Sequence, residues 1–113
     1  RDIMPMDVAK ELTFTGRILN GEQAKEVGLV TRVANDPLAA AMELAEEIAG
    51  KNPDAVRAGK ALYEQAWHAD ARTGLELEAA LQAQLIGTAN QIEAVKANFE
   101  KRTPAFQPAT RTR

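Results

Sequence analysis

The stretch that decides the fold is Leu12–Val33, LTFTGRILNGEQAKEVGLVTRV. Its pattern predicts the end of one helix, a short extended piece, a second helix and a short strand. Gly16 and Gly28 are expected to end the two helices, because glycine adopts positive φ at little steric cost. Asn20 and Gln23 have the spacing of a capping box, which satisfies two N–H groups at a helix start. The stretch is therefore a series of short, capped elements.

The residues around these caps give the bounds of the first helix, the extended piece and the strand. Asp7 is expected to cap a helix over Val8–Phe14. Arg17–Leu19 is long enough only for an extended segment. Leu29–Val33 alternates in polarity and contains two valines, which is typical of a short strand.

The remainder of the chain predicts four longer helices. Asp36 and Asn52 each precede a proline, a pairing that marks a helix start. Two further pairs have capping-box spacing: Thr73 with Glu76, and Asn90 with Glu93. The predicted helices run from Pro37 to before Gly50, from Pro53 to about His68, over Gly74–Ile86, and over Gln91–Arg102. Gly59 lies inside a helix, where it predicts the close approach of another backbone.

These patterns predict a mainly α fold with at most two short strands. The helices are amphipathic and rich in alanine, which buries little apolar area at ~25 cal/mol per Å². We therefore expect them to dock on a further domain or on copies of the chain. Residues 107–113 are expected to form a flexible, basic tail.

Composition limits the classes of function. The chain has 113 residues, 27% of them charged, and a formal net charge of −2. That balance lacks the basic field of a nucleic-acid-binding protein, and no apolar run reaches the ~20 residues of a membrane span. Cysteine is absent, which excludes thiol nucleophiles and fits the expected cytoplasmic location. The chain starts at Arg1, and we expect it to be a piece of a longer protein.

His68, the only histidine, is one candidate for chemistry. Glu64 precedes it by one turn and Asp70 follows it, so a histidine–carboxylate pair could act as a general acid and base. The alternative is an exposed histidine near a helix C-terminus, where its cationic form is favoured. We prefer the alternative, because no nucleophile is nearby in the sequence.

Three other groups of residues have structural interpretations that we prefer. The acidic residues lack the histidine or carboxylate spacing of a metal site and predict a solvated face; they are Glu43, Glu46, Glu47, Glu76 and Glu78. The glycines fit neither phosphate-loop pattern and predict turns and caps; they are Gly16, Gly21 and Gly28. Tyr63 and Trp67 lie one turn apart, a spacing more typical of a core or interface than of a cofactor stack.

Basic residues gather toward the C-terminus, at Lys96, Lys101, Arg102, Arg111 and Arg113. Such side chains bind phosphates through charge-assisted hydrogen bonds. They also complement a helix C-terminus and solvate a tail, and the residues alone favour this second interpretation.

The segment Glu11–Val33 resembles a segment of the crotonase superfamily, the enoyl-CoA hydratase/isomerase proteins. The matched residues are Leu12, Thr15, Gly16, Arg17, Ile18, Gln23, Ala24, Gly28, Leu29, Val30 and Val33. Later motifs follow in the family's order: Asp36-Pro37-Leu38, Ile48–Pro53, the Leu75–Leu85 helix, and FEKRTPAF at Phe99–Phe106. The resemblance covers essentially the whole chain.

The resemblance implies that residues 1–35 end a core of ββα units. Residues 36–106 are then a C-terminal helical domain that caps the core and builds trimers or hexamers. Family members act on acyl-CoA thioesters through an enolate, which two backbone N–H groups stabilise, with glutamates as acid and base. Those residues precede the present segment, so no catalytic residue, metal or covalent cofactor is assigned to this chain.

One binding residue follows from the resemblance. Lys101 matches a family lysine that meets the phosphates or adenine of CoA, although Asn98 stands where the family has an aromatic residue. The parent protein is therefore expected to be an enoyl-CoA hydratase or a related isomerase, and this piece to be inactive alone. The alternative is a non-enzymatic helical module that only assembles.

Overall fold

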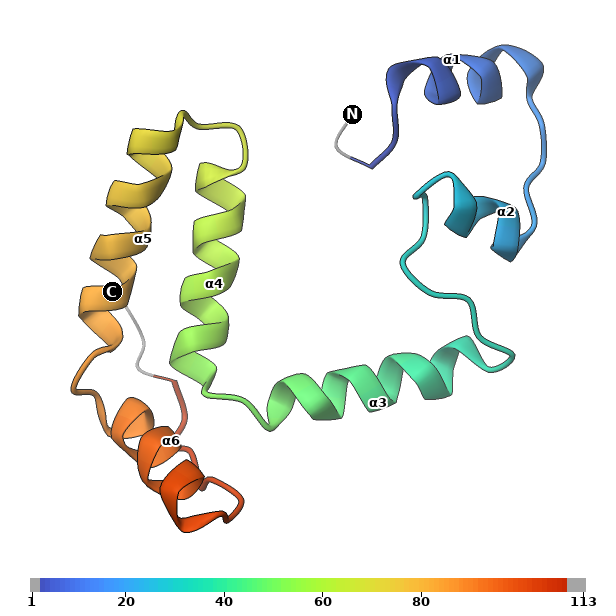
Figure 1. The fold of residues 1–113 in the computed structure, drawn as a ribbon. Helices are drawn as coiled ribbons and strands as arrows, with labels where there is room; N and C mark the ends of the chain where they lie inside the picture. Colours follow the sequence, from blue (N-terminus) through green and yellow to red (C-terminus); the bar gives the residue numbers. More distant parts are fainter. Residues whose placement is uncertain (1–2, 110–113) are drawn as a thin grey trace. The chain divides into compact units, whose positions relative to one another are not determined.

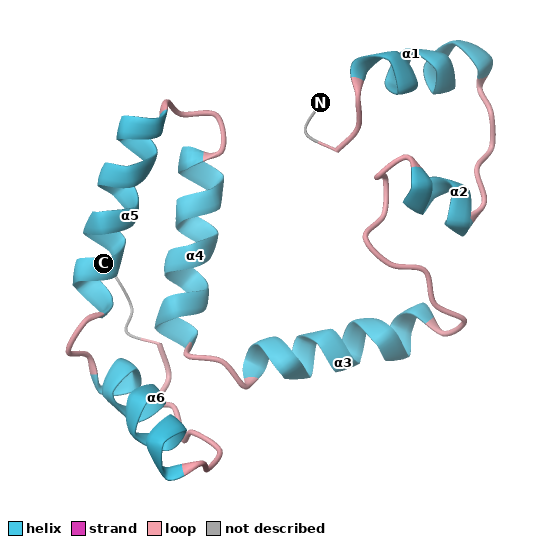
Figure 2. Cartoon of the chain, in the orientation of Figure 1, coloured by secondary structure: helices cyan, strands magenta, loops and turns pink. Residues whose placement is uncertain are grey.

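The computed structural model describes residues 3–109 and contains six α-helices (Figures 1 and 2). They are α1 (Met6–Thr15), α2 (Gly21–Glu26), α3 (Pro37–Ala49), α4 (Pro53–Ala66), α5 (Ala71–Leu85) and α6 (Ala89–Glu100). Within the described range there is no strand, so the predicted mainly α fold is confirmed. None of these helices has the length and apolar character needed to cross a bilayer, as judged over the described residues.

The chain divides into two compact units, residues 1–42 and 43–113, and α3 runs from the first into the second. The domain boundaries predicted after residues 35 and 106 stay predictions. Each unit is described here by itself.

In the first unit, both the start and the end of α2 have the geometry predicted for them. The side chains of Asn20 and Gln23 form the reciprocal capping box, with N···O distances of 2.9 and 3.0 Å. Gly28 has a φ of 79°, and the N–H of Leu29 donates to the carbonyl of Ala24 at 2.8 Å. With the bond from the Gly28 N–H to the Lys25 carbonyl, this is a Schellman motif.

The predicted cap and extent of α1 were partly wrong. Gly16 ends the helix in the left-handed conformation, as predicted. The helix begins at Met6 after Pro5, however, with no side-chain cap. Asp7 consequently lies inside the first turn, where its carboxylate complements the helix dipole instead of capping it.

The strand predicted at Leu29–Val33 was wrong, and Arg17–Leu19 is a loop. The N–H groups of Leu29 and Val30 both point back to the Ala24 carbonyl, at 2.8 and 3.4 Å. They therefore complete the end of α2. A strand needs a partner for its ladder of hydrogen bonds, and residues 3–109 supply none.

In the second unit, α4 and α5 lie side by side (Figure 1). Asn52 caps α4 as predicted, accepting bonds from the N–H groups of Asp54 and Ala55. In the first unit, Asp36 accepts in the same way from the Ala39 N–H at the start of α3. The close backbone approach predicted at Gly59 is absent within residues 3–109, because nothing outside the adjoining backbone of α4 lies within 4 Å of a Cβ placed there.

Both later capping boxes were wrong, since each helix starts a few residues earlier than predicted. Asp70 caps α5, accepting from the N–H groups of Arg72 and Thr73. Thr88 caps α6, accepting from the Gln91 N–H. In both cases a short oxygen-bearing side chain preceding the predicted residue takes the cap.

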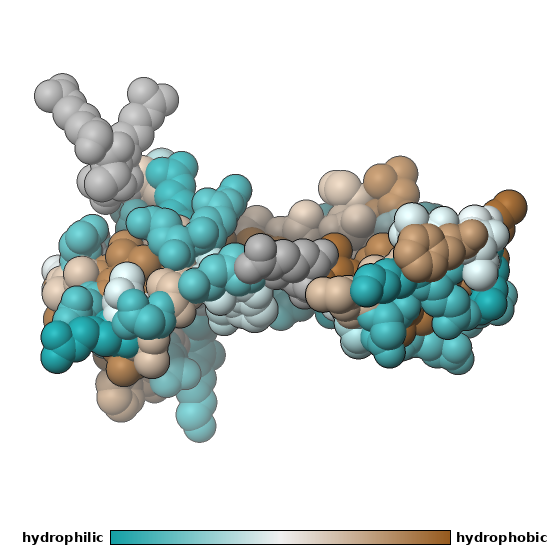
Figure 3. All heavy atoms as spheres, turned by 90° about the horizontal axis from the view of Figure 1, so that it is seen from above, coloured by the Kyte–Doolittle hydropathy of each residue, from teal (hydrophilic) through white to brown (hydrophobic). Residues whose placement is uncertain are grey.

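Very little of the chain is buried. Among the described residues, only Ala24, Asn90 and Ala97 are buried, and many large apolar side chains are exposed. Figure 3 shows hydrophobic atoms at the surface over both units. Within residues 3–109 the helices thus keep exposed apolar faces, and the predicted docking of these faces stays a prediction.

Candidate functional site

The C-terminal end of α6 carries the candidate binding residue, Lys101. Its φ is 53°, which makes it the only residue other than glycine with positive φ in the described range. The N–H of Lys101 donates to the Asn98 carbonyl at 3.3 Å, and the N–H of Arg102 to the Ala97 carbonyl at 3.0 Å. Lys101 therefore occupies the position of a Schellman motif that glycine usually fills.

Arg102 is held by two carboxylates of α6, Glu93 and Glu100. Its two terminal nitrogens bind the two oxygens of Glu93, with Nη1–Oε1 at 2.5 Å and Nη2–Oε2 at 2.9 Å. Its Nε donates to Glu100 Oε2 at 2.6 Å. A forked pair of this kind is the strongest arrangement for a guanidinium and a carboxylate.

Glu93 also accepts a bond from the backbone N–H of Ala105, at 2.7 Å. The bonds from Arg102 and then from Ala105 lower the pKa of Glu93 from 4.5 to about 2. The same pairing raises the pKa of the Arg102 guanidinium. Glu93 is therefore ionised throughout the neutral range, and it ties α6 to the segment that follows it.

A second tie lies one turn earlier on α6. Asn90 is 4% exposed, accepts from the Gln107 N–H at 2.8 Å and donates to the Gln107 carbonyl at 3.1 Å. Its amide also donates to Asp54 Oδ2 at 2.7 Å. Asn90 thus joins α6, α4 and the C-terminal segment by hydrogen bonds.

The basic residues near the C-terminus therefore differ in whether a carboxylate pairs with them. Arg102 is taken up by Glu93 and Glu100, whereas Lys101 is exposed and takes part in none of the ion pairs between described residues. Lys96 is also exposed. Arg111 and Arg113, predicted to belong to this cluster, lie outside the described residues.

The structure gives the carboxylates around His68 other partners. Glu64 pairs with Lys60 at 3.6 Å. Asp70 caps α5, and the Thr73 hydroxyl, chief among its hydrogen-bond donors, lowers the pKa of that carboxyl. His68 itself is exposed just beyond α4, as the structural interpretation predicted.

The acidic residues are exposed, as predicted for a solvated face, and the glycines lie at helix starts and ends. No group of three or more histidine, aspartate or glutamate side chains that could hold a metal occurs within residues 3–109. Glu47 pairs with Lys51 and Glu76 with Arg72. Gly21 opens α2, while Gly16 and Gly28 follow helices with positive φ.

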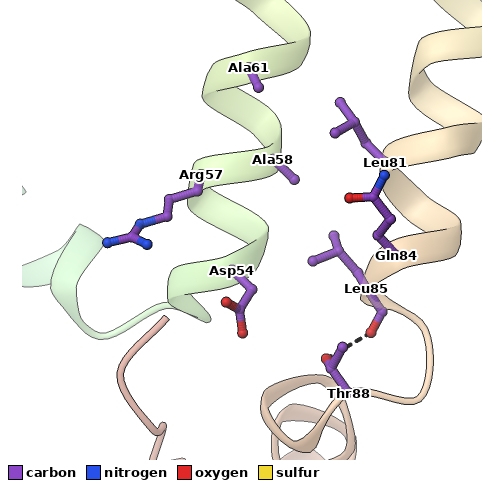
Figure 4. Close-up of a pocket in the computed structure, with 8 residues that line it drawn as sticks. All are labelled: Asp54, Arg57, Ala58, Ala61, Leu81, Gln84, Leu85 and Thr88. Carbon is purple, nitrogen blue, oxygen red and sulfur yellow. Dashed lines mark hydrogen bonds between the residues drawn. The ribbon is translucent and has the colours of Figure 1, made fainter. Parts of the chain in front are cut away.

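Two grooves lie along the α4–α5 pair. In the first, of about 430 Å³, Ala58 and Ala61 of α4 face Leu81 and Leu85 of α5, while Arg57 extends away from it (Figure 4). The second, of about 440 Å³, is lined by Tyr63 and Trp67, among others. Their rings are 5.8 Å apart at a tilt of 56°, and each residue is more than 60% exposed.

Comparison with known proteins places this arrangement among relatives. The profile of the family described as enoyl-CoA hydratase/isomerase matches residues 1–109. The mitochondrial enoyl-CoA hydratase domain-containing protein 2 of Mus musculus is 41% identical over 105 residues, which are 88% of this chain and 36% of that protein. The mitochondrial methylglutaconyl-CoA hydratase of Mus musculus is 37% identical over 108 residues, 90% of this chain and 34% of that protein.

A solved structure agrees with these relatives. The crystal structure of an enoyl-CoA hydratase from Bacillus anthracis matches with a TM-score of 0.87 and 37% identity, over 93% of this chain and 42% of that one. The chain spans about a third of the length of the curated relatives named above.

Proposed function

The chain belongs to the enoyl-CoA hydratase/isomerase family, and from that premise we propose that it is the C-terminal helical part of an enzyme acting on acyl-CoA thioesters. The family match over residues 1–109 is the observation that carries the proposal. The reaction proposed is the addition of water across the 2,3 double bond of an enoyl-CoA through a thioester enolate, or a related isomerisation. Acyl-CoA is then the substrate, and no covalently bound cofactor is needed.

The acid–base chemistry of such a reaction is proposed to reside elsewhere in the protein. Enolate formation requires donors aimed at the thioester oxygen and a carboxylate near the reacting carbons. Glu64 pairs with Lys60, Asp70 caps α5, and His68 is exposed just beyond α4, so none is proposed as catalytic. The relatives extend well beyond the part that this chain spans, which leaves room for these groups.

The helices are proposed to cap that core and to build a homo-oligomer, a trimer or hexamer. Support comes from their uncovered apolar faces. Trp67 is 62% exposed and Phe99 81% exposed, although each side chain is large and apolar. Exposed apolar area of this kind gains free energy when another surface covers it, about 25 cal/mol per Å².

Lys101 is proposed to bind phosphate groups of CoA. Three observations support this: its exposure, its fixed backbone, and the absence of a carboxylate partner for it among the described residues. An ammonium that no internal carboxylate neutralises can form charge-assisted bonds to a phosphate.

The cytoplasmic location predicted from the lack of cysteine stays a prediction.

The test is to assay the 113-residue chain beside the full-length protein that carries it, with crotonyl-CoA as substrate and loss of the conjugated thioester absorbance as the readout. We expect turnover by the full-length protein and none by the chain alone. A full-length protein that binds neither CoA nor enoyl-CoA would overturn the proposal. That result would favour the alternative, a non-enzymatic helical module, which the thin core and exposed apolar faces also fit.

A further inference from the structure

The chain reversal after α6 is held in place from both of its ends. At the centre stands Lys101, in a backbone conformation that a residue with a side chain rarely adopts. Left-handed backbone in a residue other than glycine persists only where the surroundings enforce it. The backbone bonds of the Schellman motif hold its near side, and Glu93, eight residues earlier on α6, holds the chain on its far side.

Glu93 uses both carboxylate oxygens on the segment beyond the reversal. It binds the guanidinium of Arg102, which directly follows Lys101, and the N–H of Ala105, three residues further on. The Arg102 Nη1 also donates to the Thr103 carbonyl at 3.2 Å. The side chain of Glu93 is 21% exposed, so these bonds are partly shielded from water.

This arrangement gives two neighbouring cations different tasks. Arg102 forms ion pairs with Glu93 and Glu100. Lys101 projects from a turn whose path those bonds determine, and it has no carboxylate of its own among the ion pairs of the described chain. Removing Glu93 would release the segment beyond the turn, from Arg102 to Ala105, without touching the Lys101 side chain.

We propose that Glu93 is a positioning residue, which holds the turn at Lys101 so that the lysine ammonium is presented to a phosphate-bearing ligand. The inference rests on the proposed role of Lys101 in binding CoA phosphates, and it adds a residue that does not touch the ligand. Asn90 supports the same segment through its two bonds to Gln107.

A merely electrostatic role for Glu93 predicts the opposite effect. Removal of a carboxylate near a polyanion reduces repulsion and strengthens binding. A positioning role predicts weaker binding, because the lysine then samples more orientations and loses entropy when it binds. The sign of the change therefore separates the two.

The experiment measures the affinity of the full-length protein for free CoA and for dephospho-CoA by calorimetry at low salt. The variants are Glu93→Ala, Glu93→Gln, Lys101→Asn and the double variant Glu93→Ala/Lys101→Asn. Asparagine tolerates the left-handed conformation, so Lys101→Asn removes the charge and keeps the turn. Glu100→Gln is the matched control, because it removes a carboxylate from the same arginine and leaves Glu93 in place.

We expect Lys101→Asn and Glu93→Ala each to weaken CoA binding by about two- to fivefold, the size of a solvent-exposed ion pair. The double variant should bind no more weakly than Lys101→Asn. Glu93→Gln should recover part of the affinity, because its amide oxygen still accepts a bond. Glu100→Gln should not weaken binding, and KM for an enoyl-CoA should rise with kcat unchanged in the two weakened variants.

Other outcomes of the affinity measurements would each contradict a different proposal. If Lys101→Asn weakens binding and Glu93→Ala does not, or if their effects add, Glu93 does not position Lys101. If Lys101→Asn leaves both affinities unchanged, the proposed role of Lys101 fails, and the positioning role fails with it. If the unaltered protein does not bind CoA at all, the proposed enzyme function itself is wrong.

Discussion

Arg102, just beyond the end of α6, binds both carboxylate oxygens of Glu93, which lies nine residues earlier on that helix. The pair closes the turn between the helix and the segment that ends at the last described residues. Since Glu93 also accepts the Ala105 N–H, a single carboxylate receives three hydrogen bonds. Four predictions follow from this turn and from the caps of the neighbouring helices.

The turn should lose stability in acid. The pKa of Glu93 is lowered from 4.5 to about 2 in the folded chain, so its stabilising effect is complete above the unfolded value of 4.5. That effect should decline as pH falls from about 4.5 to about 2. Melting curves by circular dichroism across this range should show the decline, and Glu93→Gln should reduce its slope. An equal slope in both proteins would contradict the prediction.

Lys101→Gly should stabilise the chain. Left-handed backbone costs a residue with a side chain about 1–2 kcal/mol, and glycine avoids this cost. Glycine is also more flexible in the unfolded state, which offsets part of the gain. We expect a net gain of about 1 kcal/mol in urea unfolding. Lys101→Ala is the control, since it removes the ammonium and keeps the strain. Equal stability of the two variants would show that the charge, not φ, determines the change.

Asn90→Ala should destabilise the second unit by about 1–3 kcal/mol, because it removes the hydrogen bonds that Asn90 makes to Gln107 and to Asp54. Amide hydrogen exchange at Gln107 provides the local readout, and its protection should fall. Asn90→Asp keeps the acceptor for the Gln107 N–H but sets a carboxylate against Asp54. It should therefore be destabilising at neutral pH and recover in mild acid.

Asp70→Ala should lower the melting temperature by a few degrees, the usual scale for loss of a helix cap in a small domain. Asp70 caps α5 through the N–H groups of Arg72 and Thr73. Glu76→Ala is the comparison, because the sequence predicted a cap that included Glu76. It removes only an exposed pair with Arg72 at 4.0 Å, and we expect almost no change. A larger loss from Glu76→Ala would contradict the assigned cap.

Local chemistry made much of the fold predictable from sequence. The capping box at Asn20 and the glycine ends of α1 and α2 depend on residues within one turn of each other. Where two oxygen-bearing side chains compete for one helix start, spacing alone misleads. Asp70 lies three residues before Thr73, and Thr88 two before Asn90, and in each case the earlier residue forms the cap.

The candidate site was predictable only in part, since its bonds join residues far apart in sequence. Lys101 could be named from a resemblance, but the pairs Asn90–Gln107 and Glu93–Arg102 span 17 and 9 residues. The sequence placed Glu93 in a capping box, and its pairing with Arg102 depends on how the chain turns after α6. The strand expected at Leu29–Val33 failed for a similar reason, because pairing requires a partner that no local pattern reveals.

The scarcity of buried apolar side chains has a consequence for how this chain melts. The rise in heat capacity on unfolding comes from newly hydrated apolar surface, and averages about 12–15 cal/mol/K per residue in compact domains. With only two alanines buried among the described apolar residues, the isolated chain should show a much smaller rise. Its stability should therefore vary little with temperature, its urea dependence should be shallow, and its thermal transition should be broad rather than sharp.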